Sequence, residues 1–310
     1  MKKRFSYIVF LILILWSVLG QSQQIQQYSQ YYLNKFLFNT GIAGIYPYYQ
    51  ARVNNRYQWI GMTDAPKTFT LSLYGPDRKR EMGYGGYVFS DVTGPTSRTG
   101  FYGAYSYLLK LRGNDRLALS LSAGFLQYKI DGSKITLHDD YDPSLGNQVY
   151  SSYLPDANFS VYYKTTDYFA GISFMQLFNN VIKFDGDIFS VQDNRVRTHF
   201  FIIGGYNFEI NNDWDIVPST VIKEMWPTPI QLDLTIRGVY KKMLWAGFTY
   251  RTLDAVAFMI GYEYDKQIMF GYSYDYSITN LKNYNSGTHE LMIGYKFSKI
   301  KRTSFHSKID

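Results

Sequence analysis

The sequence predicts an all-β protein: a transmembrane antiparallel β-barrel of the outer-membrane type, with 14 strands. Three observations predict this fold. Aromatic residues make up 19% of the 310 residues while the mean hydropathy is only −0.24, so apolar and polar residues are interleaved. Many segments alternate with a period of two between apolar residues and small or polar ones. Their connections mostly alternate between long and short, which is typical of outer-membrane barrels and unexplained in a soluble β-sandwich.

Residues 1–20 are predicted to be a secretory signal peptide. They combine a basic start, Lys2 to Arg4, with an apolar stretch over residues 5–19 and a small residue, Gly20. A transmembrane anchor is the alternative, but about 15 apolar residues are short for a membrane helix. The next best candidate helix, residues 244–261, contains Arg251 and Asp254. We therefore expect an exported chain without a membrane helix.

Residues 21–50 are predicted to be a separate N-terminal segment rich in glutamine and tyrosine. The three-to-four-residue spacing of Ile25, Tyr28, Tyr32 and Phe36 favours a short amphipathic helix. The sequence leaves two positions open for this segment, a plug in the barrel lumen and a periplasmic terminus.

The barrel itself is predicted over residues 51–297, followed by a basic periplasmic tail over 298–310. Short connections are expected at 112–114, 165–166, 210–212, 241–242 and 265, and long ones at 130–155, 177–194 and 278–286. The expected strands are 51–59, 67–74, 83–91, 98–111, 115–129, 156–164, 167–176, 195–209, 213–222, 229–240, 243–251, 254–264, 266–277 and 287–297.

The alternation also predicts which side chains point into the lumen. In the last strands the Phe, Ile, Leu and Tyr residues share one face, which we assign to lipid, with the aromatic rings forming belts at the membrane interfaces. The opposite face must then hold the charged residues, where they need ion pairs or water. These predicted lumen residues are Asp233, Arg237, Arg251, Glu263, Asp275, Glu290 and Lys296.

Charge and composition exclude several functions. Three of the seven net positive charges lie in the predicted signal peptide and three more in the tail, which leaves +1 on the residues between. A nearly neutral body has no basic stripe for nucleic acid. The chain has no cysteine and its histidines are scattered, which does not match the ligand spacing of a zinc site, so no cofactor or metal is expected. Asp139, Asp140 and Asp142 crowd one loop, but Leu145 occupies the position where a calcium loop needs glycine.

Several short motifs recur in a characteristic order and spacing. They are Asn39 to Gly44, Arg56 to Trp59 with Gly61, Ala65 to Thr68, Gly83 to Asp91 with Gly94, Ser273 to Ser277, Gly287 to Glu290, and Tyr295. With these motifs the chain resembles the PorP/SprF outer-membrane proteins of the type IX secretion system over nearly its whole mature length, although Thr40-Gly41 stand where the family usually has a Pro-Ala pair. The resemblance implies a location in the cell outer membrane and a partner role in place of catalysis.

The resemblance further implies the expected partners: other type IX secretion proteins and the C-terminal domain of a secreted adhesin or other cargo, with lipids of the outer membrane around the barrel. Two other classes stay open, a passive porin or solute transporter and a barrel hydrolase, although no nucleophile-and-base arrangement for a hydrolase is visible. Partner-binding residues are predicted at a rim beside the first hairpin and in the two long loops after the fifth and seventh strands, both assigned to the outer side. They are Arg56, Trp59, Pro66, Tyr141, Tyr150, Tyr153, Phe184 and Phe189.

Overall fold

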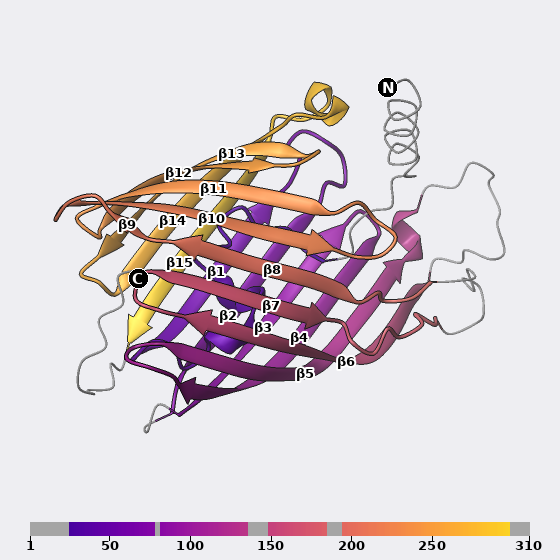
Figure 1. Ribbon diagram of the computed structural model, residues 1–310. Helices are drawn as coiled ribbons and strands as arrows, with labels where there is room; N and C mark the ends of the chain where they lie inside the picture. The colour runs from indigo at the N-terminus through magenta and orange to yellow at the C-terminus, as the bar shows by residue number, and fades with distance from the viewer. Residues whose placement is uncertain (1–24, 78–80, 136–147, 185–193, 298–310) are drawn as a thin grey trace, which may run out of the picture.

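The strands form one antiparallel sheet that closes on itself. In the computed structural model, which describes residues 25–77, 81–135, 148–184 and 194–297, each strand pairs with its neighbours in chain order. The first strand also pairs with the last, Tyr49 opposite Phe297, so the barrel has no free edge (Figure 1). The predicted closed barrel is thereby confirmed. Among the described residues, no helix is long and apolar enough to cross a membrane.

The strand bounds agree closely with the alternation in the sequence. Strand β9 continues β8 after a break at Asn207 and pairs with the same neighbour, so the two count as one of 14 barrel strands. The break falls between the register pairs Gly205–Ser219 and Phe208–Ile216, beside Pro218 of β10, which has no backbone N–H to donate to the ladder. The strands are β1 (Tyr49–Tyr57), β2 (Lys67–Pro76), β3 (Met82–Thr93), β4 (Thr96–Lys110), β5 (Arg116–Asp131), β6 (Val149–Lys164), β7 (Tyr168–Met175), β8 (His199–Tyr206), β9 (Phe208–Glu209), β10 (Trp214–Glu224), β11 (Gln231–Tyr240), β12 (Leu244–Arg251), β13 (Ala255–Tyr264), β14 (Ile268–Ser277) and β15 (Thr288–Phe297).

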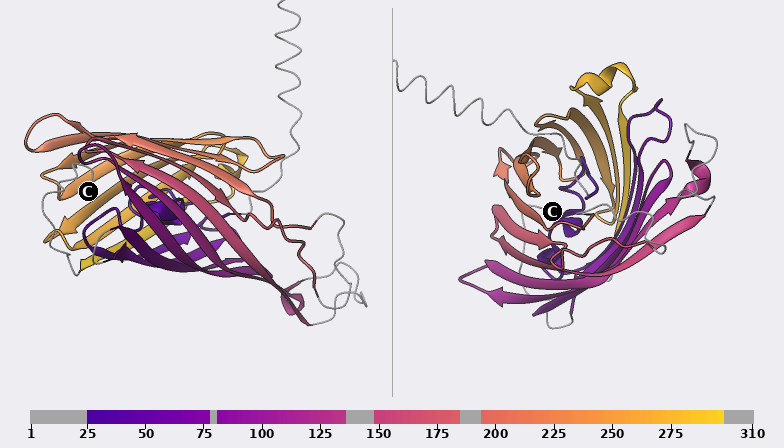
Figure 2. Two further views of the ribbon diagram at one scale, coloured as in Figure 1. Left: turned by 60° about the horizontal axis from the view of Figure 1, so that its bottom comes forward. Right: turned by 90° about the vertical axis from the view of Figure 1, so that its right-hand side faces the viewer.

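The two ends of the barrel differ. We call the end where β1 begins and β15 ends the terminal end, and the opposite end the loop end. Tight turns join strands at the terminal end; those after β11 and β13 place consecutive residues in the left-handed region, Lys241 and Lys242 in one and Asp265 and Lys266 in the other. The long connections after β1, β5, β7 and β14 all lie at the loop end. The β5–β6 hairpin projects beyond its neighbours there (Figure 2).

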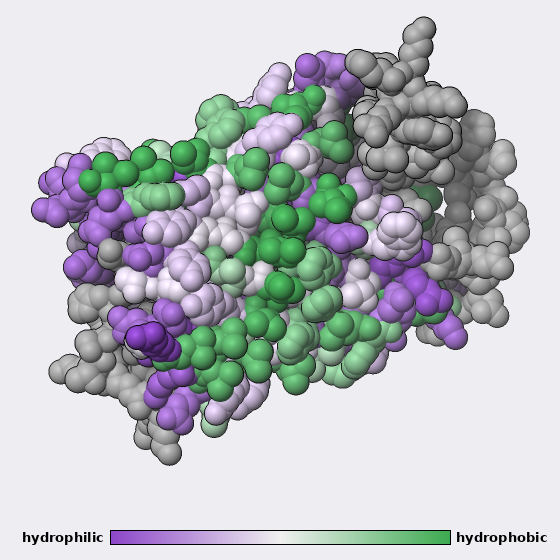
Figure 3. Space-filling view, viewed as in Figure 1, coloured by the Kyte–Doolittle hydropathy of each residue, from purple (hydrophilic) through white to green (hydrophobic). Residues whose placement is uncertain are grey.

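The outer wall is apolar. Phe101, Leu121 and Phe258 each expose more than half of their surface, and space-filling shows apolar residues gathered along the wall with hydrophilic ones at the ends (Figure 3). At the terminal end, outward-facing aromatic rings of neighbouring strands contact one another. Examples are the pairs Tyr168–Tyr206 and Trp214–Tyr240. These rings form the predicted aromatic belt at that end.

The lumen holds the N-terminal segment. Residues 25–48 lie inside the ring of strands and run from the loop end to the terminal end, where β1 begins (Figure 2). In place of the expected amphipathic helix, the segment forms turns and two single-turn 3-10 helices, η1 (Lys35–Leu37) and η2 (Thr40–Ile42). Two further single turns, η3 (Gly132–Lys134) and η4 (Asn280–Asn283), lie in the loop-end connections.

Several sequence predictions concern residues outside the described ranges. The signal peptide, the basic tail, the acidic loop of residues 139–142, and the candidate binding residues Tyr141 and Phe189 all fall there.

Candidate functional site

The N-terminal segment is fixed to the barrel wall by polar contacts along its length. Near the loop end the hydroxyls of Tyr28 and Thr70 hydrogen-bond at 2.5 Å. Farther along, the Asn39 amide donates to two backbone carbonyl oxygens, one on β6 at 2.9 Å and one on β7 at 3.1 Å. The Thr40 hydroxyl meets that of Ser120 at 2.8 Å. Each contact satisfies a buried polar group, so the segment is part of the folded core.

Close packing also holds the segment near the terminal end. Gly83 of β3 lies directly against the backbone of Ala43 and Gly44, and a Cβ atom at Gly83 would overlap the Ala43 carbonyl. Apolar side chains fill much of the remaining space. Phe36 stacks on Tyr74 with ring centroids 4.4 Å apart, and Tyr87 stacks on Tyr102 at 4.9 Å. The aromatic excess therefore serves the lumen as well as the outer belts.

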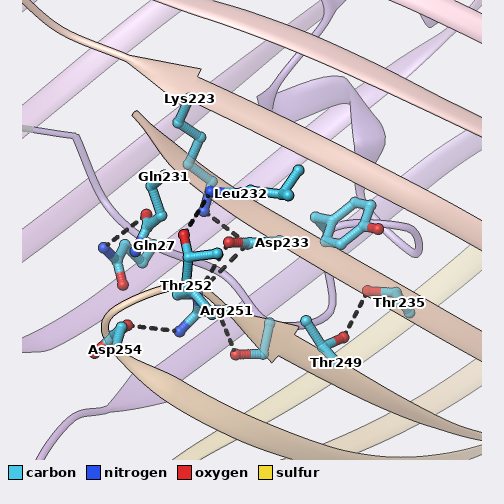
Figure 4. Close-up of polar contacts among 12 residues, drawn as sticks. Gln27, Lys223, Gln231, Leu232, Asp233, Thr235, Thr249, Arg251, Thr252 and Asp254 are labelled. Carbon is cyan, nitrogen blue, oxygen red and sulfur yellow. Dashed lines mark hydrogen bonds and ion pairs between the residues drawn. The ribbon is translucent and has the colours of Figure 1, made fainter. Parts of the chain in front are cut away.

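A buried ion network occupies the lumen near the loop end. Arg251 of β12 lies at its centre, 3.4 Å from Asp233, 3.3 Å from Asp275 and 3.1 Å from Asp254 (Figure 4). Lys223 binds the same Asp233 at 2.8 Å. These side chains are at most 6% exposed, except that of Asp254 at 25%. Water cannot solvate such charges, so each needs its partners.

The same network joins the first and last strands to the N-terminal segment. Arg56 and Glu290 are register partners across the β1–β15 pairing and form a 3.0 Å ion pair, and Arg56 also binds Asp275 at 2.8 Å. Glu290 accepts the backbone N–H groups of Ser29 and Gln30 at 2.8 and 3.2 Å. The buried cations Arg56, Lys223 and Arg251 are matched by the carboxylates Asp233, Asp275 and Glu290.

The hydroxyl of Ser29 lies in the middle of this network. It accepts hydrogen bonds from Arg56 at 3.1 Å and from Arg251 at 2.9 Å, and it donates to Asp275 at 2.5 Å. Because two guanidinium groups and one carboxylate converge on one side chain of the segment, the ion network serves as the anchor of the segment. The arrangement holds a polypeptide in place.

The seven predicted lumen charges all point inward, but the structure divides them. Asp233, Arg251, Asp275 and Glu290 belong to the ion network. Glu263 and Lys296 form a separate 2.8 Å pair nearer the terminal end. Arg237 instead lies over the rings of Tyr32 and Trp245.

Sequence reasoning missed Lys223, because the expected strand ended at residue 222 whereas β10 continues to Glu224. Continuing the alternation from buried Val221 would have placed Lys223 inward.

The three residues predicted at the rim, Arg56, Trp59 and Pro66, do not lie together. Arg56 does not lie on the rim: it is 2% exposed and belongs to the lumen network. Trp59 and Pro66 do lie in the β1–β2 connection at the loop end. The backbone N–H of Trp59 donates to Thr288 and that of Ile60 to Gly287, so this connection is joined to the one between β14 and β15.

The connection after β5 is shorter than the sequence predicted, whereas the one after β7 is longer, because β7 ends at Met175 and β8 begins only at His199. Tyr150 and Tyr153, expected in a loop, lie in strand β6, which begins at Val149; Tyr150 is buried and Tyr153 faces outward. Phe184 is half-buried in the connection after β7. With Ile182, Arg98 and Tyr128 it lines a recess of about 320 Å³ at the loop end.

Among the described residues, no cluster of three His, Cys, Asp or Glu side chains is arranged to hold a metal ion.

Comparison with known proteins identifies the family. A family model described as "Type IX secretion system membrane protein PorP/SprF" matches residues 20–295. The chain belongs to the PorP/SprF family. This PorP/SprF protein is accordingly a β-barrel of the cell outer membrane and a membrane protein of the type IX secretion system. A comparison with curated proteins gave no match.

Solved structures similar to this PorP/SprF barrel are outer-membrane proteins with little sequence identity. The Acinetobacter baumannii outer membrane protein Omp33 is 9% identical, with a TM-score of 0.44 over 81% of this chain and 98% of its own. A mutant of the monoaromatic hydrocarbon channel TodX is 9% identical, with a TM-score of 0.43 over 80% and 88%. A Pseudomonas aeruginosa FadL homologue is 11% identical, with a TM-score of 0.41 over 82% and 90%.

Proposed function

We propose that this PorP/SprF protein is a non-enzymatic, partner-binding component of the type IX secretion system. It binds the secretion or gliding machinery and helps to export or anchor a secreted adhesin that carries a C-terminal sorting domain. The observation that carries the proposal is the occupied lumen. Beside the N-terminal segment, two lumenal cavities have volumes of only about 50 and 30 Å³. Such volumes hold a few water molecules or one compact ion, whereas pockets for drug-sized ligands measure roughly 300 Å³ or more.

The loop end is the proposed receiving surface for the secreted partner. In an exported barrel with an even number of strands, the first strand begins and the last ends on the periplasmic side. The connections after β5 and β7 then face outward. The recess at Phe184 combines apolar side chains with Arg98 and Asp91, a composition suited to a polypeptide. The terminal end would face the periplasmic machinery.

Affinity purification of the tagged protein from outer membranes tests the proposal. We expect type IX secretion components and a protein with a sorting domain to co-purify with the wild type. Phe184→Ala should lower recovery of the secreted protein, because it removes an apolar wall of the recess. Leu111→Ala is the matched control: this exposed side chain lies in a turn at the terminal end. Recovery of no secretion component with a folded wild-type barrel would contradict the proposal.

Conductance measurements separate this function from that of a porin. We expect the wild-type barrel in planar lipid bilayers to show little steady conductance, because the segment fills the lumen. Deletion of residues 25–44 removes that obstruction and should give open-channel steps if the barrel still forms. Stable, large wild-type conductance together with uptake of small solutes by liposomes would favour the porin instead.

A further inference from the structure

A cationic cavity lies between the N-terminal segment and the barrel wall, near the terminal end. Its volume is about 50 Å³, and it extends from buried Ile42 and Tyr74 to Lys242, which is exposed in the turn after β11. Of the residues that the structure describes, five cationic side chains and one carboxylate line it. The cations are Lys35, Arg52, Arg237, Lys242 and Lys296, and the carboxylate is Glu263.

The single carboxylate does not neutralise this cavity. Glu263 is already engaged with Lys296 at 2.8 Å. Arg52 hydrogen-bonds only neutral groups among the described residues: the side chains of Gln50, Tyr74 and Met269. Arg52 thus forms no ion pair with another described residue.

Arg237 is placed to bind a ligand through its edge. The centre of its guanidinium lies 4.7 Å from the Tyr32 ring centroid and 5.9 Å from that of Trp245. Among the described residues it makes no hydrogen bond or ion pair beside these ring contacts. Contact with rings engages the face of a guanidinium and leaves its five N–H donors free at the edge.

Two of the lining residues also carry unpaired donors. The hydroxyl of Tyr32 and the indole N–H of Trp245 are buried, and neither has a hydrogen-bond partner among the described residues. The two side chains are 7% and 4% exposed. Unpaired buried polar groups are rare in folded proteins, so these two constitute a second observation that points to a missing acceptor.

We infer that this cavity binds a compact oxyanion, a carboxylate or phosphate group. The group would accept hydrogen bonds from the guanidinium edges of Arg52 and Arg237, the geometry that arginine offers to both kinds of oxyanion. The rings of Tyr32 and Trp245 would flank it, and the exposed Lys242 marks the entry from the terminal end. The site is distinct from the loop-end recess and needs no secretion partner to be present.

Calorimetric titration of the purified, delipidated full chain in detergent tests the inference. Sodium phosphate and sodium acetate, each against sodium chloride at equal ionic strength, should give saturable 1:1 binding in the wild type. Arg52→Gln and Arg237→Gln should each weaken affinity at least tenfold. Lys110→Gln, which changes an exposed cation beyond the lumen at the same barrel end, should leave affinity unchanged. Heat-modifiable migration on gels verifies that each variant is folded.

A second set of measurements identifies the source of the oxyanion. Binding only from micelles doped with phosphatidylglycerol, again lost in the two arginine variants, would assign the site to a lipid headgroup. If either variant fails to fold, phosphorus NMR of the wild type replaces the calorimetry of that variant. The phosphate line should broaden when the protein is added and sharpen again when acetate competes for the site. The inference would be overturned if every probe gave binding heats no larger than those of sodium chloride. It would also be overturned if both folded variants bound with the affinity of the wild type.

Discussion

Glu290→Gln should destabilise the barrel strongly although it changes only one atom of the side chain. Glu290 is fully buried, and it accepts hydrogen bonds from Arg56 and from the backbone N–H groups of Ser29 and Gln30. The amide keeps one acceptor oxygen and loses the charge, so the buried network retains its three cations against two carboxylates. Removing one partner of a buried ion pair costs about 3–5 kcal/mol. We expect a loss of that size in the free energy of unfolding.

Urea unfolding in detergent, followed by far-UV circular dichroism, measures this loss. Glu81→Gln is the matched control: Glu81 pairs with Lys110 at 3.7 Å, and both side chains are nearly half exposed, so its loss should cost below about 1 kcal/mol. Limited proteolysis with mass spectrometry should also reveal new cleavage within residues 25–48 of the Glu290→Gln protein, because the anchor of the segment is weakened.

A double-mutant cycle with Arg56→Gln makes the reasoning refutable. The single variants unbalance the network in opposite directions, whereas the double variant restores equal numbers of buried cations and carboxylates. The double variant should therefore lose about 2–3 kcal/mol less than the two single losses combined. Losses that add to within about 0.5 kcal/mol would show that the two side chains are not coupled and would refute the assignment of an anchor.

Three further changes test the packing of the segment and the rim. Gly83→Ala should cost about 1–3 kcal/mol in urea unfolding because its Cβ meets the backbone of the segment, whereas Gly103→Ala, with open space around it, should change stability little. Ser29→Ala should cost about 1–3 kcal/mol in the same assay, since it leaves Asp275 and two guanidiniums short of a partner; unchanged stability would exclude the hydroxyl from the anchor. Trp59→Ala should lower partner recovery or barrel yield several-fold, and the rim prediction fails if affinity purification and folded yield both match the wild type.

The strands could be predicted because one face of each meets lipid. That constraint imposes a strict period of two, which the sequence displays in the last strands almost without exception. Strand β6 was harder. Its first residues include Pro155, and β7 pairs with β6 only from Phe159 onward, so Pro155 lies on an edge without a ladder partner on that side. Proline is tolerated there, but in sequence it looks like the end of a loop.

The sequence predicts which side chains face the lumen but not which of them form ion pairs. Alternation fixes whether a side chain points inward, and the structure places the seven predicted charges on the lumen side of their strands. Alternation does not fix which charges meet, because that depends on the register between strands and on a segment without periodicity. The pairing of Arg56 with Glu290 follows from the first strand lying against the last, and the role of Ser29 has no signal in the sequence.

The contact between Ser29 and Glu290 has a consequence for the order of assembly. It joins residues 261 positions apart, and Glu290 lies on the strand that completes the barrel. The anchor at Ser29 therefore cannot form until nearly the whole chain has been synthesised and transported, although other contacts of the segment, such as that of Tyr28 with Thr70, involve earlier strands. Anchoring at Ser29 and closure of the cylinder then occur together, since both require β15. An unclosed intermediate would leave Ser29 without Glu290 and the barrel with an open strand edge, which makes the intermediate prone to aggregation until the final strand is in place.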